Sequence, residues 1–97
     1  MEVSDLNEYV RVTLSRDPLL ASLRLRGEIG NFKRYPSGHL YFNLKDERCQ
    51  VPGVMWKTDA SRLSFEPEDG MSVIVTGRVT VHPESGRYQV VVTQMRP

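Results

Sequence analysis

Aromatic and basic side chains gather in the middle of the chain, in a pattern suited to binding rather than to catalysis. Tyr41 lies within the alternating stretch His39–Lys45, and Trp56 ends the next apolar stretch, followed directly by Lys57. If the apolar residues of these stretches face a core, the rings of Tyr41 and Trp56 face outward. Outward rings can stack on nucleic-acid bases, which is worth about 1–3 kcal/mol per base.

The charge of the chain is unevenly distributed. The sequence holds 13 Lys and Arg against 12 Asp and Glu, a net charge of +1, which by itself is too small to indicate a polyanionic partner. The window 24–57 is nevertheless clearly positive, and the balancing acids lie near the N-terminus and in residues 59–69. A basic surface with aromatic rings is typical of sequence-tolerant binding to single strands. The basic residues of the window are Arg24, Arg26, Lys33, Arg34, Lys45, Arg48 and Lys57, and its acids are Glu28, Asp46 and Glu47.

Each of these residues also has a purely structural interpretation. Trp56 could fill core space, and an outward Tyr41 can reflect β-propensity alone. Phe32 could cap the core instead of contacting a base. Arg24 and Arg26 could simply lie on a solvent-exposed strand face, or they could pair with acids of the N-terminal segment.

The sequence offers no pattern for catalysis or metal binding. Cys49 is the single cysteine, so we expect no intrachain disulfide and no thiolate metal cluster, which fits a reducing compartment. His39 and His82 are too far apart in the chain to indicate a shared metal. Cys49 has no neighbouring histidine that could activate it, and no phosphate-binding glycine loop precedes a helix. We therefore expect no catalytic residue, metal or cofactor in this chain.

An amphipathic helix is predicted over Ser4–Arg16. Ser4 is a candidate N-cap, and Pro18 is expected to end the helix. No stretch approaches the roughly 20 apolar residues of a membrane span, and the N-terminus lacks the basic start and apolar run of a secretory signal. These features predict neither a secretory signal nor a membrane partner. The apolar residues at helical spacing are Leu6, Tyr9, Val10 and Leu14.

Alternation between turn-forming clusters predicts five strands and a short helical turn. Glycines inside the first and fourth strands, Gly27 and Gly77, suit the bends of a tightly coiled barrel. The predicted fold class is mainly β: a five-stranded OB-fold Greek-key barrel with an N-terminal helix and a short helical connection between strands three and four. We expect one domain over residues 1–97, with residues 1–18 packed on a barrel of residues 22–97. The predicted strands are Leu23–Ile29, His39–Lys45, Gln50–Trp56, Met71–His82 and Arg87–Met95, and the helical turn is Thr58–Leu63.

Longer strings of the sequence carry a resemblance to a known family. They are Val3–Asn7, Arg26–Phe32 (RGEIGNF), Ser37–Asp46 (SGHLYFNLKD), Val54–Lys57, Asp69–Met71 and Gly86–Gln89. Together they resemble the N-terminal domain of the exodeoxyribonuclease VII large subunit across essentially the whole chain. The resemblance implies an OB-fold that holds single-stranded DNA in a bacterial, cytoplasmic enzyme that degrades such DNA from either end. It also implies that the nuclease domain and the region binding the small subunits lie outside this chain.

The resemblance also bears on individual residues. The family usually has an aromatic and then a basic residue where Trp56 and Lys57 stand, which favours an outward Trp56. The sequence departs from the family pattern at Val51-Pro52-Gly53, where Pro52 stands in place of a basic residue and removes a ladder donor. We therefore expect a shorter third strand and a weaker hold on phosphates there.

The resulting hypothesis is that single-stranded DNA lies across the first three strands. Tyr41, Trp56 and Phe32 would stack on bases, and His39 and Asn43 would hydrogen-bond to base or sugar edges. The residues expected at phosphates are Lys33, Arg34, Lys45, Lys57 and Arg87.

Two other functions stay open at the level of sequence. One is a docking or assembly module, in which the exposed stripe Leu6, Val10 and Leu14 would drive self-association. The other is an OB module that binds transfer RNA.

Overall fold

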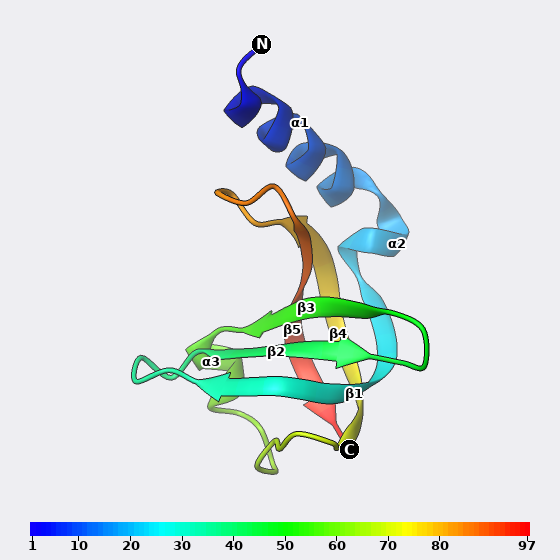
Figure 1. The fold of residues 1–97 in the computed structure, drawn as a ribbon, viewed down its shortest axis with the longest axis vertical. Helices are drawn as coiled ribbons and strands as arrows, with labels where there is room; N and C mark the ends of the chain where they lie inside the picture. Colours follow the sequence, from blue (N-terminus) through cyan, green and yellow to red (C-terminus); the bar gives the residue numbers. More distant parts are fainter.

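The computed structural model, which describes residues 1–97, has the expected order of helices and strands except for one additional short helix, α2 (Figure 1). The five strands close into a barrel in the order β1-β2-β3-β5-β4, and only β3 and β5 pair in parallel. The predicted fold class, a mainly β five-stranded barrel with an N-terminal helix and a short helix between strands three and four, is confirmed. The elements are α1 Val3–Arg16, α2 Pro18–Ala21, β1 Leu23–Arg34, β2 Leu40–Lys45, β3 Gln50–Met55, α3 Lys57–Ala60, β4 Ser72–Val81 and β5 Tyr88–Arg96.

The core fills the inside of the barrel with apolar side chains from alternate strand positions. On β2 the predicted inward residues Leu40, Phe42 and Leu44 are all buried. Complete burial of one such side chain contributes about 1.5–3 kcal/mol to folding. The core residues are Ile29, Leu40, Phe42, Leu44, Met55, Ala60, Val73, Val75, Val90, Val92 and Met95.

Strand β1 is longer than predicted and belongs to both halves of the barrel. Residues 23–28 pair with β4, and residues 28–34 pair with β2. The second ladder contains a bulge, because Gly30 pairs with Asn43 but Lys33 pairs with Tyr41. Between these two pairs β1 advances by three residues and β2 by only two, so β1 contains one extra residue. The sequence-based end at Ile29 was wrong because the bulge interrupts the alternation on which that end was based.

The bend of β1 is fixed by hydrogen bonds to the loop before β4. Ile29 donates its N–H to the Met71 carbonyl at 2.9 Å and accepts one from Gly70 N–H at 2.8 Å. The N–H of Phe32 donates to Oδ1 of Asp69 at 2.8 Å. The bulge thus leaves none of these backbone groups unpaired.

Pro52 does not shorten β3 in the way expected. β3 pairs with β2 along all of Gln50–Met55, with Pro52 opposite Asn43. Its parallel ladder with β5 contains only the pairs Gly53–Val90 and Val54–Val91, both beyond Pro52. The missing N–H donor of Pro52 therefore coincides with a short ladder between β3 and β5, while β3 itself keeps its full length.

The N-terminal helix matches its prediction but extends beyond the barrel, beside the β4–β5 hairpin (Figure 1). Glu2 is the N-cap in place of Ser4, and its N–H donates to Oδ2 of Asp5 at 2.9 Å. Pro18 does more than end α1, because it starts the short helix α2, whose N–H groups at Leu19 and Leu20 donate to Asp17. No residue of α1 is buried. No helix is both long and apolar enough to cross a membrane.

The β2–β3 turn is closed by a single carboxylate. Backbone N–H groups of Arg48 and Cys49 donate to Oδ1 of Asp46, each at 2.8 Å. These hydrogen bonds stabilise the charged form, so they lower the pKa of Asp46 below its usual value. The turn therefore keeps the pairing of β2 with β3 in register next to the outer face.

Gly77 allows β4 and β5 to approach each other closely. A Cβ at this position would overlap the carbonyl oxygen of Val91, a backbone atom that cannot move without disturbing the ladder. We expect Gly77→Ala to lower the free energy of unfolding by about 1–3 kcal/mol, the usual cost of overpacking, measured by urea denaturation.

Gly30→Ala is the matched control for this prediction. Its Cβ would meet only atoms of the flexible Lys45 side chain, at 3.5 Å and beyond. Its stability should stay within about 0.5 kcal/mol of the parent chain. If Gly77→Ala is as stable as the parent, the close approach of β4 and β5 is refuted.

Candidate nucleic-acid interface

The outer face of β1, β2 and β3 carries the side chains that alternate with the core. Lys33 pairs with Tyr41, and Tyr41 pairs with Val54. Residues directly opposite each other in a ladder project to the same side of the sheet. Lys33 and Tyr41, together with Asn43 two residues further along β2, therefore share one surface, as predicted.

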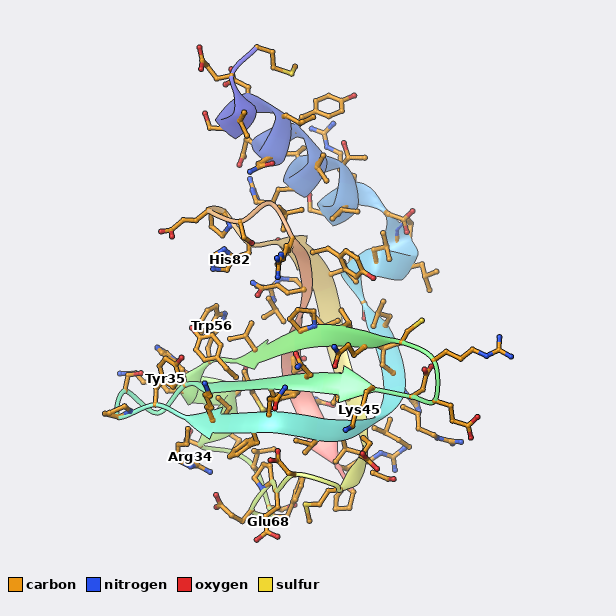
Figure 2. The ribbon with its side chains drawn as sticks, viewed as in Figure 1. Arg34, Tyr35, Lys45, Trp56, Glu68 and His82 are labelled. Atoms are coloured by element: carbon orange, nitrogen blue, oxygen red, sulfur yellow. The ribbon has the colours of Figure 1, made fainter.

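Four rings form an aromatic cluster at one end of this face: Tyr35, His39, Tyr41 and Trp56. The ring centroids of Tyr35 and Tyr41 are 4.8 Å apart, and those of Tyr41 and Trp56 are 6.3 Å apart. The rings of Trp56 and His39 are nearly perpendicular, with their centroids 5.1 Å apart. Tyr35 and Trp56 are 46% and 38% exposed, and Figure 2 shows both at the same end of β2. The cluster therefore presents ring surface to solvent on the face where the sequence predicted stacking.

A hydrogen bond holds the imidazole of His39 in the cluster. The backbone N–H of Lys57 donates to Nδ1 of His39 at 2.9 Å. Since Nδ1 accepts this bond, the neutral ring carries its proton on Nε2. Trp56 is the N-cap of α3, directly after β3, so the same contact fixes the start of α3 and the place of the Trp56 ring.

All three lysines of the chain lie around the aromatic cluster and its strands. Lys33 lies beside Tyr41 on the outer face, and Lys57 follows Trp56. Lys45 forms a surface ion pair with Glu28 at 3.5 Å. An exposed pair of this kind is worth no more than about 1 kcal/mol, so Lys45 stays able to exchange its partner for a phosphate.

A polar groove runs next to the cluster, with a volume of about 370 Å³. Its lining includes amide side chains, a lysine and two tyrosines. Amides both donate and accept hydrogen bonds, so this groove can satisfy the edges of different bases. The polar and aromatic lining residues are Asn31, Lys33, Tyr35, Tyr41, Phe42, Asn43 and Gln89.

Phe32 and Arg34 were expected at DNA, but the structure places them with the core side of β1. Phe32 packs against the core, with its ring 6.5 Å from that of Phe42. The guanidinium of Arg34 lies 6.0 Å from the Phe32 centroid and pairs with Glu66. Figure 2 shows Arg34 on the opposite side of β1 from Trp56. The bulge explains this placement, since the extra residue reverses the alternation of β1 and brings Lys33 outward in place of Phe32.

Arg87 lies apart from the aromatic cluster, in the β4–β5 hairpin. It is exposed there, and its carbonyl accepts the N–H of His82 at 2.8 Å. The structure thus brings together Lys33, His39, Tyr41, Asn43, Trp56 and Lys57, with Lys45 further along β2, and leaves Phe32, Arg34 and Arg87 outside that group.

Sequence reasoning missed Tyr35, Asn31 and Gln89. Tyr35 falls in a cluster of turn-forming residues, but its N–H donates to the His39 carbonyl at 3.0 Å and closes the β1–β2 hairpin. That bond brings the Tyr35 ring next to Tyr41. A tyrosine directly before the Pro36–Gly38 turn, between two alternating stretches, was the available signal.

The site can bind flat rings and anions. No three His, Cys, Asp or Glu side chains gather closely enough to hold a metal ion. The one free cysteine, Cys49, is exposed near the β2–β3 turn. What the face presents is aromatic surface, amides and lysines, which is the chemistry of nucleic-acid binding.

The contact between His39 and Lys57 yields a prediction about Trp56. His39→Ala removes the acceptor for the Lys57 N–H and the edge contact on the indole. We expect stronger acrylamide quenching of the fluorescence of Trp56, the single tryptophan. The free energy of unfolding should fall by about 1 kcal/mol, the usual net value of one hydrogen bond. The control is His82→Ala in the β4–β5 hairpin, and equal quenching in both variants would contradict the assigned role of His39.

Comparisons with known proteins agree with this description. The family model of an OB-fold nucleic acid binding domain matches residues 1–96. The chain is 43% identical to the exodeoxyribonuclease 7 large subunit of Staphylococcus epidermidis, covering 99% of this chain and 22% of the relative. It is 41% identical to the same subunit of Clostridium kluyveri, covering 100% of this chain and 24% of the relative. The chain thus spans less than a quarter of the length of these relatives.

Solved structures share the fold at lower identity. One is a replication protein A heterotrimer bound to single-stranded DNA, with a TM-score of 0.61, 21% identity, and coverage of 78% of this chain and 56% of that one. Another is an asparaginyl-tRNA synthetase from Pyrococcus horikoshii, with a TM-score of 0.59, 23% identity, and coverage of 77% and 18%. At such identities the likeness concerns the fold alone. Because the family match spans the barrel and α1 alike, the chain belongs to the OB-fold nucleic acid binding domains, in the form found at the N-terminal region of exodeoxyribonuclease VII large subunits.

Proposed function

We propose that the face built from the aromatic cluster and the three lysines binds single-stranded DNA and holds it as the substrate of an exodeoxyribonuclease. The observation that carries this proposal is the aromatic cluster, whose exposed rings lie on the β2–β3 side of an OB barrel. That side is where OB-folds bind oligonucleotides.

The geometry of the cluster suits stacking on bases. Trp56 meets both Tyr41 and His39 edge-on, at interplanar angles of 85° and 83°. Neither neighbour is stacked flat on the indole, and the Trp56 side chain remains 38% exposed. A base lying on Trp56 or Tyr35 would replace water on an aromatic face, the interaction that dominates sequence-tolerant binding of single strands.

A single strand fits this surface better than a duplex. In a duplex each base face is already stacked on its neighbours, and only the groove edges are accessible to protein side chains. The exposed rings here need an unstacked base. The amides of the polar groove would then hydrogen-bond to the freed edges without selecting one base, which suits an enzyme that must process any sequence.

The choice of DNA and the enzymatic context rest on the relatives. They are named exodeoxyribonuclease large subunits, and the replication protein A structure is described as bound to single-stranded DNA. We assign hydrolysis and small-subunit binding to parts of the enzyme outside residues 1–97. The proposed location of the domain is the bacterial cytoplasm. Binding of the strand is the only activity proposed for this domain.

Removal of two rings is the direct test of stacking. Trp56→Ala combined with Tyr41→Ala should weaken binding of a fluorescent oligothymidylate by about thirtyfold or more, since two stacking interactions worth about 1–3 kcal/mol each are removed. Binding is measured by fluorescence anisotropy at low salt. The control is Tyr88→Ala, an exposed tyrosine at the start of β5. A double variant that binds as well as the parent would refute the stacking surface.

The lysines predict the salt dependence. The triple variant Lys33→Gln, Lys45→Gln and Lys57→Gln should reduce the slope of log affinity against log salt by about 0.7 for each phosphate that is no longer neutralised. The measurement is a titration between about 50 and 200 mM salt, with RNA and duplex competitors. Arg11→Gln, on α1, is the control. Self-association that is independent of salt, without oligonucleotide binding, would instead favour a docking module.

A further inference from the structure

A second basic surface lies on β1, β4 and β5, where β1 leaves β2. Two rows of paired residues cross these strands with their side chains outward. The first row is Arg24 on β1, Thr76 on β4 and Gln94 on β5, and the second is Arg26, Ile74 and Arg96. We call Arg24, Arg26 and Arg96, with Thr76 and Gln94, the arginine patch. A groove of about 390 Å³ is lined by Arg24, Ile74, Thr76, Gln94, Met95 and Arg96.

The arginines of the patch are not used for ion pairing within the chain. The ion pairs of the structure involve Arg11, Arg34, Lys45 and Arg62 as the cations. Pairing of Arg24 and Arg26 with acids of the N-terminal helix, an alternative left open by the sequence, does not occur. Glu8 of that helix pairs with Arg11. Three uncompensated guanidinium groups on adjacent rows give a strongly positive local potential.

The chemistry of the patch fits a phosphodiester rather than a protein surface. Protein interfaces need an apolar centre with buried anchors. The two apolar side chains that line the groove, Ile74 and Met95, are half-buried and buried, and none of the exposed large hydrophobic residues belongs to the patch. Arginine forks match phosphate oxygens with two hydrogen bonds, and Thr and Gln side chains are common partners of the backbone.

Strand β1 connects the arginine patch to the aromatic cluster. Its outward residues run from Arg24 through Arg26, Glu28 and Gly30 to Lys33. The interval from residue 24 to residue 33 is roughly 30 Å long at about 3.3 Å per residue. Glu28 is the one acid on this path, and Lys45 neutralises it at 3.5 Å. Figure 1 shows the first part of β1 beside β4 and its later part beside β2, so a nucleic-acid strand that follows β1 passes from one surface to the other.

We propose that the arginine patch is a second phosphate-binding site, which takes up the sugar–phosphate backbone of a single strand as it leaves the aromatic cluster along β1. This inference rests on the proposed function of the cluster. The patch holds backbone only, because it offers no ring on which a base could stack. It therefore lengthens the strand that one barrel can hold, without adding base preference.

The test compares short and long oligonucleotides. Oligothymidylates of about 5 and about 15 nucleotides cover the range of OB-fold site sizes. We expect Arg24→Gln with Arg26→Gln to bind the short oligonucleotide as the parent does and the long one about fivefold to tenfold more weakly, with a salt slope reduced by about 1.4 for two phosphates no longer neutralised. The matched control, Arg11→Gln with Arg16→Gln, makes the same change of charge on α1, and circular dichroism checks that both variants fold.

The outcomes separate this inference from the proposed function. If the arginine variant loses affinity only for the long oligonucleotide and the control does not, the second site is supported. If the variant binds both lengths like the parent, or loses affinity equally for both, the second site is overturned while binding at the cluster stands. If the parent chain binds neither oligonucleotide at low salt, both proposals fall.

Discussion

The structure depends on the bend of β1, because this one strand must pair with β4 on one side and with β2 on the other to close the barrel. The bend is held by the loop before β4. Met71 and Gly70 bond to the backbone of Ile29, and Asp69 accepts the N–H of Phe32. Asn31 takes a positive φ of 49° at the same point, a conformation that asparagine tolerates better than most residues. Two segments far apart in the chain therefore fix the closure jointly.

The same bend decides which side chains reach the outer face. Continued alternation from the buried Ile29 would direct Phe32 outward and Lys33 inward. The extra residue of the bulge reverses this order, so a lysine stands beside Tyr41 and the phenyl ring enters the core. The outer face thus gains a positive charge, and the core gains an apolar ring, from a single irregularity in the ladder.

The bulge also limits how far the sequence could predict the fold and the site. On β2 alternation is strict, so the inward residues Leu40, Phe42 and Leu44 and the outward Tyr41 were predictable from local pattern alone. Three features depend on the bulge and were not predictable in this way. They are the extension of β1, the placement of Phe32 and Arg34, and the position of Tyr35 in the aromatic cluster. The bulge in turn depends on a hydrogen bond to Asp69, which no local window contains. The second helix was missed because a proline that ends one helix is equally favourable as the first residue of the next.

Charge separation reconciles a nearly neutral chain with a polyanionic ligand. The net charge of +1 determines the electrostatic field only far from the molecule, where all of its charges are at similar distances. At about 0.1 M salt the field is screened beyond about 10 Å. A bound phosphate responds to the charges within that distance. The acids Glu2, Asp5 and Glu8 lie at α1, which extends beyond the barrel (Figure 1), while the lysines and the arginine patch lie on the barrel itself. Residues 22–97, which form the barrel, hold 11 Lys and Arg against 8 Asp and Glu. The separation of α1 therefore leaves the barrel with a net positive charge, which is attractive to a nucleic-acid backbone.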